Sequence, residues 1–258
     1  MRRVVFNQKG GVGKSTITCN LAAISAARGK KTLVIDLDAQ CNSSHYLLGN
    51  AAEDIKLNVG AFFDQMLNFK LYPEKLENFV HATPFANLSI MPSSEELSSL
   101  QGKLESRYKI YKLRDALKEL SQQFDEIYID TPPALNFYTQ SALIASNRCL
   151  IPFDCDDFSR KALYTLQANV REIQQDHNSE LQIEGIVVNQ FQPRAKLPTQ
   201  LVDELIAEGL PVLKSYISSS VKIRESHQLS TPLVFFAKDH KITAEFERLY
   251  LELSKAGA

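Results

Sequence analysis

The residues from Gln8 to Thr16 are Gln-Lys-Gly-Gly-Val-Gly-Lys-Ser-Thr. They follow the apolar run 4–6 and precede apolar residues spaced at i, i+4 and i+7 over residues 17–24, which predicts a strand before the stretch and a helix after it. The three glycines permit the tight curl and the close backbone approach that a bound anion requires. A glycine-rich loop that opens a helix presents its backbone N–H groups to phosphate. The stretch therefore predicts a phosphate-binding loop.

The residue types of this loop predict how it would hold a nucleotide. The lysine, Lys14, reaches the β- and γ-phosphates, and the hydroxyl of Ser15 holds Mg²⁺. The residues expected to contact the phosphates are Gly10, Gly11, Val12, Gly13, Lys14, Ser15 and Thr16. The chain has Gln8 where the usual pattern has glycine, and Lys9 adds a second lysine. The alternative is a glycine-rich turn without a ligand, but the loop, strand and helix patterns agree with one another.

The composition allows a full hydrophobic core. The chain has 258 residues, of which 44% are hydrophobic, so one α/β domain over residues 1–258 is expected. The net charge of −1 provides no global field toward nucleic acid or membrane, so any such binding must come from a local patch. The four cysteines form no C-x-x-C pair, and the sequence shows neither a signal peptide nor a membrane-spanning run. We expect a reduced, cytoplasmic protein.

Apolar runs without polar alternation indicate strands that are buried on both faces. They lie at 4–6, 33–35, 88–90, 127–129, 150–151 and 183–188. Helical spacings occur between several of them, and the clearest cover residues 113–120, 162–173 and 242–253. The polar segment 42–96 is expected to contain short helices. This alternation predicts a mostly parallel, twisted α/β sheet flanked by helices on both faces, as in P-loop NTPases.

Polar or turn residues follow five of these runs, namely Asn7, Asp36, Asp130, Pro152 and Asn189. In open parallel sheets, ligands bind beyond the carboxyl ends of the strands. We therefore expect these five residues to gather around the phosphate loop.

Carboxylates at two of these strand ends suit phosphate chemistry. Asp36 and Asp38 point the same way if their strand continues, so they can share a Mg²⁺ ion or orient a water molecule. The alternative is a turn that is rich in Asp and Asn for backbone reasons. Asp130 ends a buried apolar strand, which suits a carboxylate that holds Mg²⁺ through water. Its alternative is a strand end followed by a proline turn.

Taken together, these segments resemble the ParA/MinD group of P-loop ATPases, which have a deviant Walker A loop. The resemblance extends over nearly the whole chain, and the Asn7-Gln8 lead-in is more similar to ParA than to MinD. It implies the small ParA form without an N-terminal helix-turn-helix domain. It also implies an ATPase that uses ATP and Mg²⁺, with slow hydrolysis that a partner stimulates.

The resemblance also implies site roles. Asp38 would orient the attacking water, Asp36 would support the metal shell, and Asn189 would hydrogen-bond the adenine edge. Lys9 would cross a homodimer interface to the partner's nucleotide. The implied catalytic residues are Lys9, Lys14 and Asp38, and the implied metal ligands are Ser15, Asp36 and Asp130. For Asn189 the alternative is an ordinary strand-end asparagine, and for Lys9 it is an exposed loop lysine. Ala39 stands where the family usually has proline, which removes no catalytic group.

ATP-bound dimers of the family bind DNA without sequence preference, which implies a basic patch. The candidates are Arg194, Lys196, Lys214, Lys222 and Arg224, with Lys238 and Lys241. Any one of them can equally be an ordinary solvated charge. The implied partners are a second copy of the chain, nonspecific DNA and a ParB-like or cargo-adaptor activator protein. The implied location is the cytoplasm, with nucleoid association in the ATP-bound form, and the cargo would be a plasmid, a chromosome region or a protein.

Two other functions compete with this hypothesis. A MinD-like membrane-associated positioning ATPase would carry a basic amphipathic C-terminal helix, whereas residues 246–253 include acidic side chains and are expected to pack on the core. A nucleotide-binding scaffold with little hydrolysis would not require the lysine and carboxylate at positions 14 and 38. We therefore expect no membrane binding and favour the hydrolysing enzyme.

Overall fold

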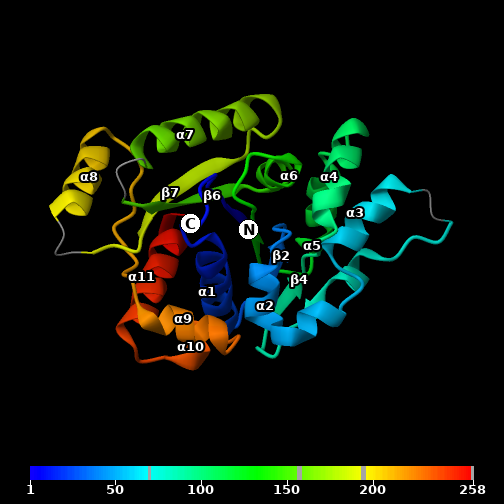
Figure 1. Ribbon diagram of the computed structural model, residues 1–258, viewed down its shortest axis with the longest axis horizontal. Helices are drawn as coiled ribbons and strands as arrows, with labels where there is room; N and C mark the ends of the chain where they lie inside the picture. The colour runs from blue at the N-terminus through cyan, green and yellow to red at the C-terminus, as the bar shows by residue number, and fades with distance from the viewer. Residues whose placement is uncertain (69–70, 156–158, 193–195, 257–258) are drawn as a thin grey trace.

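A single sheet runs through the computed structural model, which describes residues 1–68, 71–155, 159–192 and 196–256 (Figure 1). The strand order within these residues is β3-β4-β2-β5-β1-β6-β7. The strands are β1 (Arg2–Val5), β2 (Thr32–Asp36), β3 (His81–Ala82), β4 (Leu88–Met91), β5 (Glu126–Asp130), β6 (Arg148–Asp154) and β7 (Gln182–Asn189). The pairings are parallel, apart from the antiparallel pairing of β3 with β4. The predicted mostly parallel sheet is confirmed.

Helices cover both faces of this sheet. The helices of the first part of the chain are α1 (Lys14–Ala27), α2 (Asn42–Leu48), α3 (Val59–Leu67), α4 (Leu97–Ser106), α5 (Lys112–Leu120) and α6 (Phe137–Ala145). The later helices are α7 (Ser159–Asp176), α8 (Lys196–Ala207), α9 (Val221–Gln228), α10 (Leu233–Phe236) and α11 (Lys241–Ala256). Short 3₁₀ helices cover Gly49–Asp54 and Leu76–Phe79, so the segment 42–96 contains the short helices that were expected.

Successive residues of each central strand enter two different hydrophobic cores. In β1, Val4 joins the core beneath α3 to α7, whereas Val5 joins the core beneath α1, α2, α10 and α11. The same alternation separates Ile129 from Tyr128 in β5. Figure 1 shows α7 and α11 on opposite sides of the strands. Because side chains alternate between the faces of a strand, burial on both faces requires the continuous apolar runs seen in the sequence.

The C-terminal helix α11 packs on the core, as expected. Its apolar stripe, which includes Ile242, Phe246 and Leu253, is buried beside α1. Among the described residues, the structure contains no helix with both the length and the apolar character needed to span a membrane.

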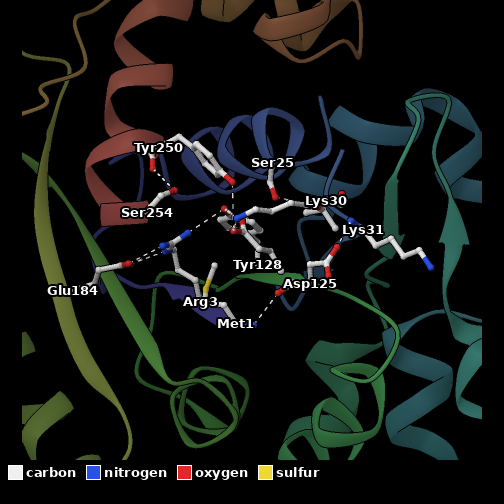
Figure 2. A network of polar contacts seen from close by, with 12 residues as sticks. Met1, Arg3, Ser25, Lys30, Lys31, Asp125, Tyr128, Glu184, Tyr250 and Ser254 are labelled. Atoms are coloured by element: carbon white, nitrogen blue, oxygen red, sulfur yellow. Dashed lines mark hydrogen bonds and ion pairs between the residues drawn. The ribbon is translucent and has the colours of Figure 1, made fainter. Parts of the chain in front are cut away.

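A network of charged and polar side chains connects the strands at their amino-terminal ends, at the edge of the sheet opposite to the phosphate loop (Figure 2). The Arg3 guanidinium donates two hydrogen bonds of 2.6 Å to Glu184 on β7 and one of 3.0 Å to the Tyr128 hydroxyl on β5. The Tyr128 hydroxyl in turn donates to Glu126, which also accepts a 2.6 Å bond from Lys30. Burial favours the neutral form of Glu126, but Lys30 and Tyr128 outweigh it and hold the pKa of this carboxyl below its usual value. The network therefore joins three strands far from the phosphate loop.

Candidate functional site

The loop between β1 and α1 has the backbone shape that its glycines were predicted to allow. Gly11 and Gly13 have φ angles of 77° and 87°, in the left-handed region that glycine adopts without strain. Gly13 directly precedes the first turn of α1. A Cβ atom at Gly13 would come within 2.2 Å of Asn189 Nδ2, so both its backbone angle and its surroundings require glycine.

Residues from neighbouring strand ends hold the loop in place. Asn7 Nδ2 donates to the Pro152 carbonyl at 2.6 Å, and Asn7 Oδ1 accepts from the Lys9 backbone N–H at 2.9 Å. Asn189 and Gln190 donate to the carbonyls of Val12 and Gly11, each at 2.9 Å. These contacts bear out the expected gathering of Asn7, Pro152 and Asn189 around the loop. The Pro152 contribution is a backbone carbonyl.

Lys14 lies inside the curl of the loop. Its Nζ donates to the Lys9 carbonyl at 2.9 Å, and the side chain is only 7% exposed. Burial lowers the pKa of Lys14, while the carboxylates of Asp130 and Asp38 oppose this shift. The two carboxylates favour the charged ammonium, and phosphate oxygens can stabilise it in the same way.

A cavity of about 340 Å³ opens above the loop. Its lining residues come from four separate parts of the chain: Gly10, Gly11, Gly13, Lys14, Ser15, Thr16, Asp38, Gln40, Asn42, Pro133 and His227. The structure thus brings the phosphate loop, the end of β2 and the proline turn after β5 into one site. The size is within the range of cavities that bind small-molecule ligands.

Asp130 lies buried beside the hydroxyl of Ser15. Its Oδ2 accepts a 2.7 Å bond from the Ser43 hydroxyl, while its Oδ1 is buried without a hydrogen bond from any described residue. Burial raises the pKa of Asp130, and the nearby Ser15 and Ser43 hydroxyls oppose that rise. A buried carboxylate oxygen without a partner is unfavourable unless water or a cation occupies its vicinity.

These features fit a Mg²⁺ site. Mg²⁺ in nucleotide enzymes is usually held by one or two protein oxygens, phosphate oxygens and several waters. Ser15 and Asp130 supply such oxygens at the phosphate end of the cavity. No group of three or more His, Cys, Asp or Glu side chains in the described ranges forms a metal cage of its own. The donor set therefore suits a cation that arrives with phosphate.

Asp36 has a different environment from Asp38. Asp36 is fully buried, and its carboxylate accepts bonds from the Ser44 N–H at 2.9 Å, the Ser44 hydroxyl at 2.7 Å and the Asp38 N–H at 3.1 Å. Burial and the adjacent Asp130 raise the pKa of Asp36. These contacts tie the end of β2 to α2. Its predicted place in the metal shell stays a prediction.

Asp38 faces the cavity. It is 8% exposed, and its Oδ1 accepts a 3.0 Å bond from the Gln40 N–H. A carboxylate fixed by one bond and open to the cavity can accept a hydrogen bond from a water molecule.

Lys9 and Asn189 lie beside the cavity rather than among its lining residues. The Lys9 side chain is about two-fifths exposed, and its Nζ is 4.0 Å from Asp154 Oδ2. The Asn189 amide is buried against the Val12 carbonyl, so its predicted adenine contact stays a prediction.

The basic candidates occupy different elements. Lys222 and Arg224 share α9, where Lys222 pairs with Glu225 at 2.6 Å and Arg224 is exposed. Lys214, Lys238 and Lys241 are also exposed, and Lys241 pairs with Glu245 at 3.6 Å. Lys196 begins α8, which Figure 1 shows apart from α9. Arg194 lies outside the described residues.

Sequence patterns did not identify several residues of this site. Ser43 and Ser44 lie shortly after the carboxylates at the end of β2, so they could have been predicted as hydrogen-bond partners of buried acids. The Ser43 hydroxyl donates to Asp130 and the Ser44 hydroxyl donates to Asp36.

No sequence pattern indicated His227. It enters the cavity from α9, and its Nε2 lies 2.9 Å from Thr16 Oγ1, which is 211 positions away in the sequence. Contacts between residues so far apart in the chain leave no pattern of neighbouring residues from which they could be predicted.

Comparison with known proteins agrees with this geometry. A family model described as an AAA domain matches residues 3–183. The chromosome-partitioning ATPase Soj of Treponema pallidum is 32% identical over 97% of this chain and 95% of its own length. The chromosome partitioning protein ParA of Myxococcus xanthus is 30% identical over 97% of this chain and 87% of its own length.

A solved structure supports the fold. The cobyrinic acid a,c-diamide synthase of Mycobacterium smegmatis, with a bound ATP analogue and magnesium, superposes with a TM-score of 0.84. It is 22% identical and covers 100% of this chain and 96% of its own. A phosphate loop with a buried lysine, carboxylates at the adjacent strand ends and full-length similarity to Soj and ParA lead to one conclusion: the chain belongs to the ParA/Soj family of partitioning ATPases.

Proposed function

We propose that this chain, acting as one domain over residues 1–258, is a partitioning or positioning ATPase that binds ATP with Mg²⁺ and hydrolyses it. The supporting observation is the convergence of Lys14, Ser15 and Asp38 on one cavity, with Asp130 buried beside it. These groups are of the types that phosphoryl transfer requires, because its catalysis consists mainly of positioning and charge stabilisation.

Hydrolysis would proceed through groups that are already close together. The Lys14 ammonium exchanges the Lys9 carbonyl for phosphate oxygens and stabilises the charge of the transition state. Asp38 accepts a hydrogen bond from the attacking water and directs it toward the γ-phosphate. Ser15 and Asp130 would hold Mg²⁺, which would supply charge neutralisation for the phosphates.

Dimer formation would be coupled to ATP through Lys9. Its side chain is partly exposed at the mouth of the loop, where a second copy of the chain can approach. We propose that Lys9 contacts the nucleotide of the partner subunit. A lysine that is supplied only in the dimer would make hydrolysis depend on assembly.

The dimer would bind DNA through basic side chains that include Arg224, Lys222 and Lys214. Pairing two subunits doubles a local patch, which makes phosphate binding depend on nucleotide despite a net charge of −1. A ParB-like or cargo-adaptor protein would stimulate hydrolysis and connect the ATPase to its cargo. The ATP-bound form would then reside on the nucleoid.

The phosphate cradle is tested by Lys14→Ala. Loss of the ammonium should abolish measurable binding of Mg-ATP in calorimetry, because the charge-assisted bonds to the phosphates disappear. Lys31→Ala is the matched control, since Lys31 is exposed and precedes β2 at the opposite edge of the sheet. Retained affinity in Lys14→Ala would contradict the assignment of the cavity to ATP.

A further inference from the structure

His227 enters the nucleotide cavity from a part of the chain that contains none of the phosphate-binding motifs. Its Nε2 lies 2.9 Å from the hydroxyl oxygen of Thr16, in the first turn of α1. Its side chain lines the same cavity as Lys14 and Ser15. The contact spans 211 positions of sequence and is made by α9, which begins after the sheet is complete.

The imidazole ring is held firmly in this position. It stacks on Tyr46, with the ring centroids 3.8 Å apart and an angle of 18° between the planes. The Tyr46 hydroxyl forms hydrogen bonds with Asn20 Nδ2 at 3.1 Å and with Ser226 Oγ at 2.8 Å. Tyr46 itself is only 1% exposed. A ring that is fixed by packing and hydrogen bonds needs little ordering when a ligand binds.

The position of Thr16 identifies the part of a nucleotide that His227 would contact. In a phosphate loop, the lysine and the following hydroxyl serve the β- and γ-phosphates and Mg²⁺, while backbone N–H groups cradle the α- and β-phosphates. Because Lys14 and Ser15 are assigned to the β- and γ-phosphates and Mg²⁺, the neighbouring Thr16 hydroxyl is left nearest to the α-phosphate. His227 lines the cavity and contacts the Thr16 hydroxyl, so its ring would lie close to the α-phosphate as well.

The chemistry of the ring suits an anionic oxygen. A neutral imidazole has one N–H donor and one acceptor nitrogen, and the Thr16 hydroxyl is satisfied by either arrangement. Burial lowers the pKa of His227, which favours the neutral ring at pH 7. With the proton on Nε2, the ring donates to Thr16 Oγ1 and can exchange that acceptor for a phosphate oxygen in the same cavity.

We propose that His227 is a nucleotide-contacting residue, whose Nε2–H donates to an oxygen of the α-phosphate when the cavity is filled. The inference rests on the proposed function, because it requires that the cavity binds ATP. Both ATP and ADP contain an α-phosphate, so this hydrogen bond survives hydrolysis and retains the nucleotide through turnover. Any bond to the γ-phosphate, by contrast, ends when that phosphate departs.

The test measures affinity for Mg-ADP and for a non-hydrolysable ATP analogue with Mg²⁺. His227→Phe keeps an aromatic ring for stacking on Tyr46 but removes the ring nitrogens. We expect it to weaken both nucleotides by the same factor, about ten-fold or more, as for loss of a hydrogen bond to a charged group. His227→Gln carries an amide N–H and should recover part of the loss with both ligands. Gln228→Ala, at the exposed neighbouring position of α9, is the matched control and should bind as wild type.

Each outcome decides for or against the proposed hydrogen bond. Equal losses with ADP and the ATP analogue, with partial recovery in His227→Gln, support it. Unchanged affinity in His227→Phe, or a loss confined to the ATP analogue, overturns it. If His227→Phe does not fold, the imidazole ¹⁵N resonances of wild-type His227 provide the measurement, and their failure to shift on addition of Mg-ADP overturns the inference. Failure of the wild type to bind either nucleotide would instead reject the proposed function.

Discussion

Lys14 and the Lys9 carbonyl form an internal hydrogen bond that keeps the phosphate loop in its curled shape. The glycines at positions 10, 11 and 13 predicted this curl, and two of them, Gly11 and Gly13, have the positive φ angles that glycine adopts freely. The internal bond itself was not predictable, since the residue pattern does not state what the lysine contacts in the absence of phosphate. On the proposed function, Lys14 would exchange the Lys9 carbonyl for a phosphate oxygen when a nucleotide binds.

Asp38 is the residue on which hydrolysis should depend most specifically. Asp38→Asn keeps an oxygen that can accept the bond from the Gln40 N–H, but it removes the carboxylate charge that we propose orients water. We expect ATP affinity close to that of wild type and a turnover rate lower by about 10²- to 10⁴-fold. Calorimetry and a phosphate-release assay measure the two quantities separately.

Two outcomes would contradict this role of Asp38. Unchanged turnover in Asp38→Asn would assign the water to another group, and a large loss of ATP affinity would make Asp38 a binding residue. Asp64→Asn, on α3 and away from the cavity, is a control with the same change of charge.

His227 should also make the stability of the nucleotide-free protein depend on pH. Burial holds its folded-state pKa below the usual value of 6.5. The unfolded chain therefore binds more protons as the pH falls through 6.5, so the contribution of neutral His227 is present above that pH and is lost below it. Urea unfolding at pH 7.5, 6.5 and 5.5 should show wild type losing free energy of unfolding relative to His227→Phe. Parallel curves for the two proteins would rule out this titration.

At the scale of elements, the strands were more predictable than the helices. Each run predicted from continuous apolar residues corresponds to a strand, because both faces of the central strands are covered. The helix α6 was not predicted, since residues on all its sides are buried and no amphipathic stripe marks it. The two-residue strand β3 was too short to give a pattern.

The ion pair between β1 and β7 should contribute strongly to stability. Arg3 and Glu184 are almost fully buried at the amino-terminal edge (Figure 2). Among the described residues, Glu184→Ala leaves the Tyr128 hydroxyl as the only hydrogen-bond partner of the Arg3 guanidinium, so we expect a loss of about 3–5 kcal/mol in the free energy of unfolding. At this chain length that loss corresponds to a fall in Tm of about 2–4 °C per kcal/mol. Calorimetric melting measures it.

The control for this change is Glu172→Ala, because Glu172 is exposed on α7. Its effect should stay within about 0.5 kcal/mol. Equal melting temperatures for Glu184→Ala and wild type would show that the attraction between Arg3 and Glu184 does no more than offset the free energy of desolvating them. Nucleotide affinity at a temperature where both proteins are folded should be the same, since the network lies away from the cavity.

At the scale of the whole molecule, the order of the strands could not be deduced from the sequence. It depends on pairings between distant segments, such as β1 with β5 on one side and β6 on the other. The gathering of strand ends around the loop was nevertheless predictable, because any parallel arrangement brings carboxyl ends to one edge. The structure adds a contribution from the C-terminal part of the chain, because His227 on α9 lines the cavity.

The proposed binding of DNA makes a prediction about the assembled dimer. Arg224→Glu should weaken ATP-dependent DNA binding, because Arg224 is exposed on α9 and carries a positive charge that phosphate can pair with. The slope of log affinity against log salt concentration should become shallower by about one for each phosphate that the variant no longer neutralises. A gel-shift series over several salt concentrations measures this slope. Arg171→Glu, exposed on α7, changes the net charge equally and is the matched control.

ATP dependence is the second part of that prediction. Lys9→Ala should remain monomeric with ATP in light scattering and should lose the DNA binding that ATP induces in wild type. Equal DNA affinity of Arg224→Glu and Arg171→Glu would show that only net charge matters. DNA binding by monomeric Lys9→Ala would separate DNA binding from dimer formation.

Genetic variants at the two edges of the sheet should affect a cell in different ways. Among the residues that the structure describes, the network of Arg3, Glu184, Glu126 and Lys30 shares no hydrogen bond with the lining of the cavity, so damage there should lower the folded fraction and expose the chain to proteases. On the proposed mechanism, damage at Asp38 should leave a folded, abundant and inactive protein that still occupies the proposed partners. Variants of the amino-terminal edge should therefore behave as recessive losses of protein, whereas those of the carboxyl edge should interfere with the wild-type copy.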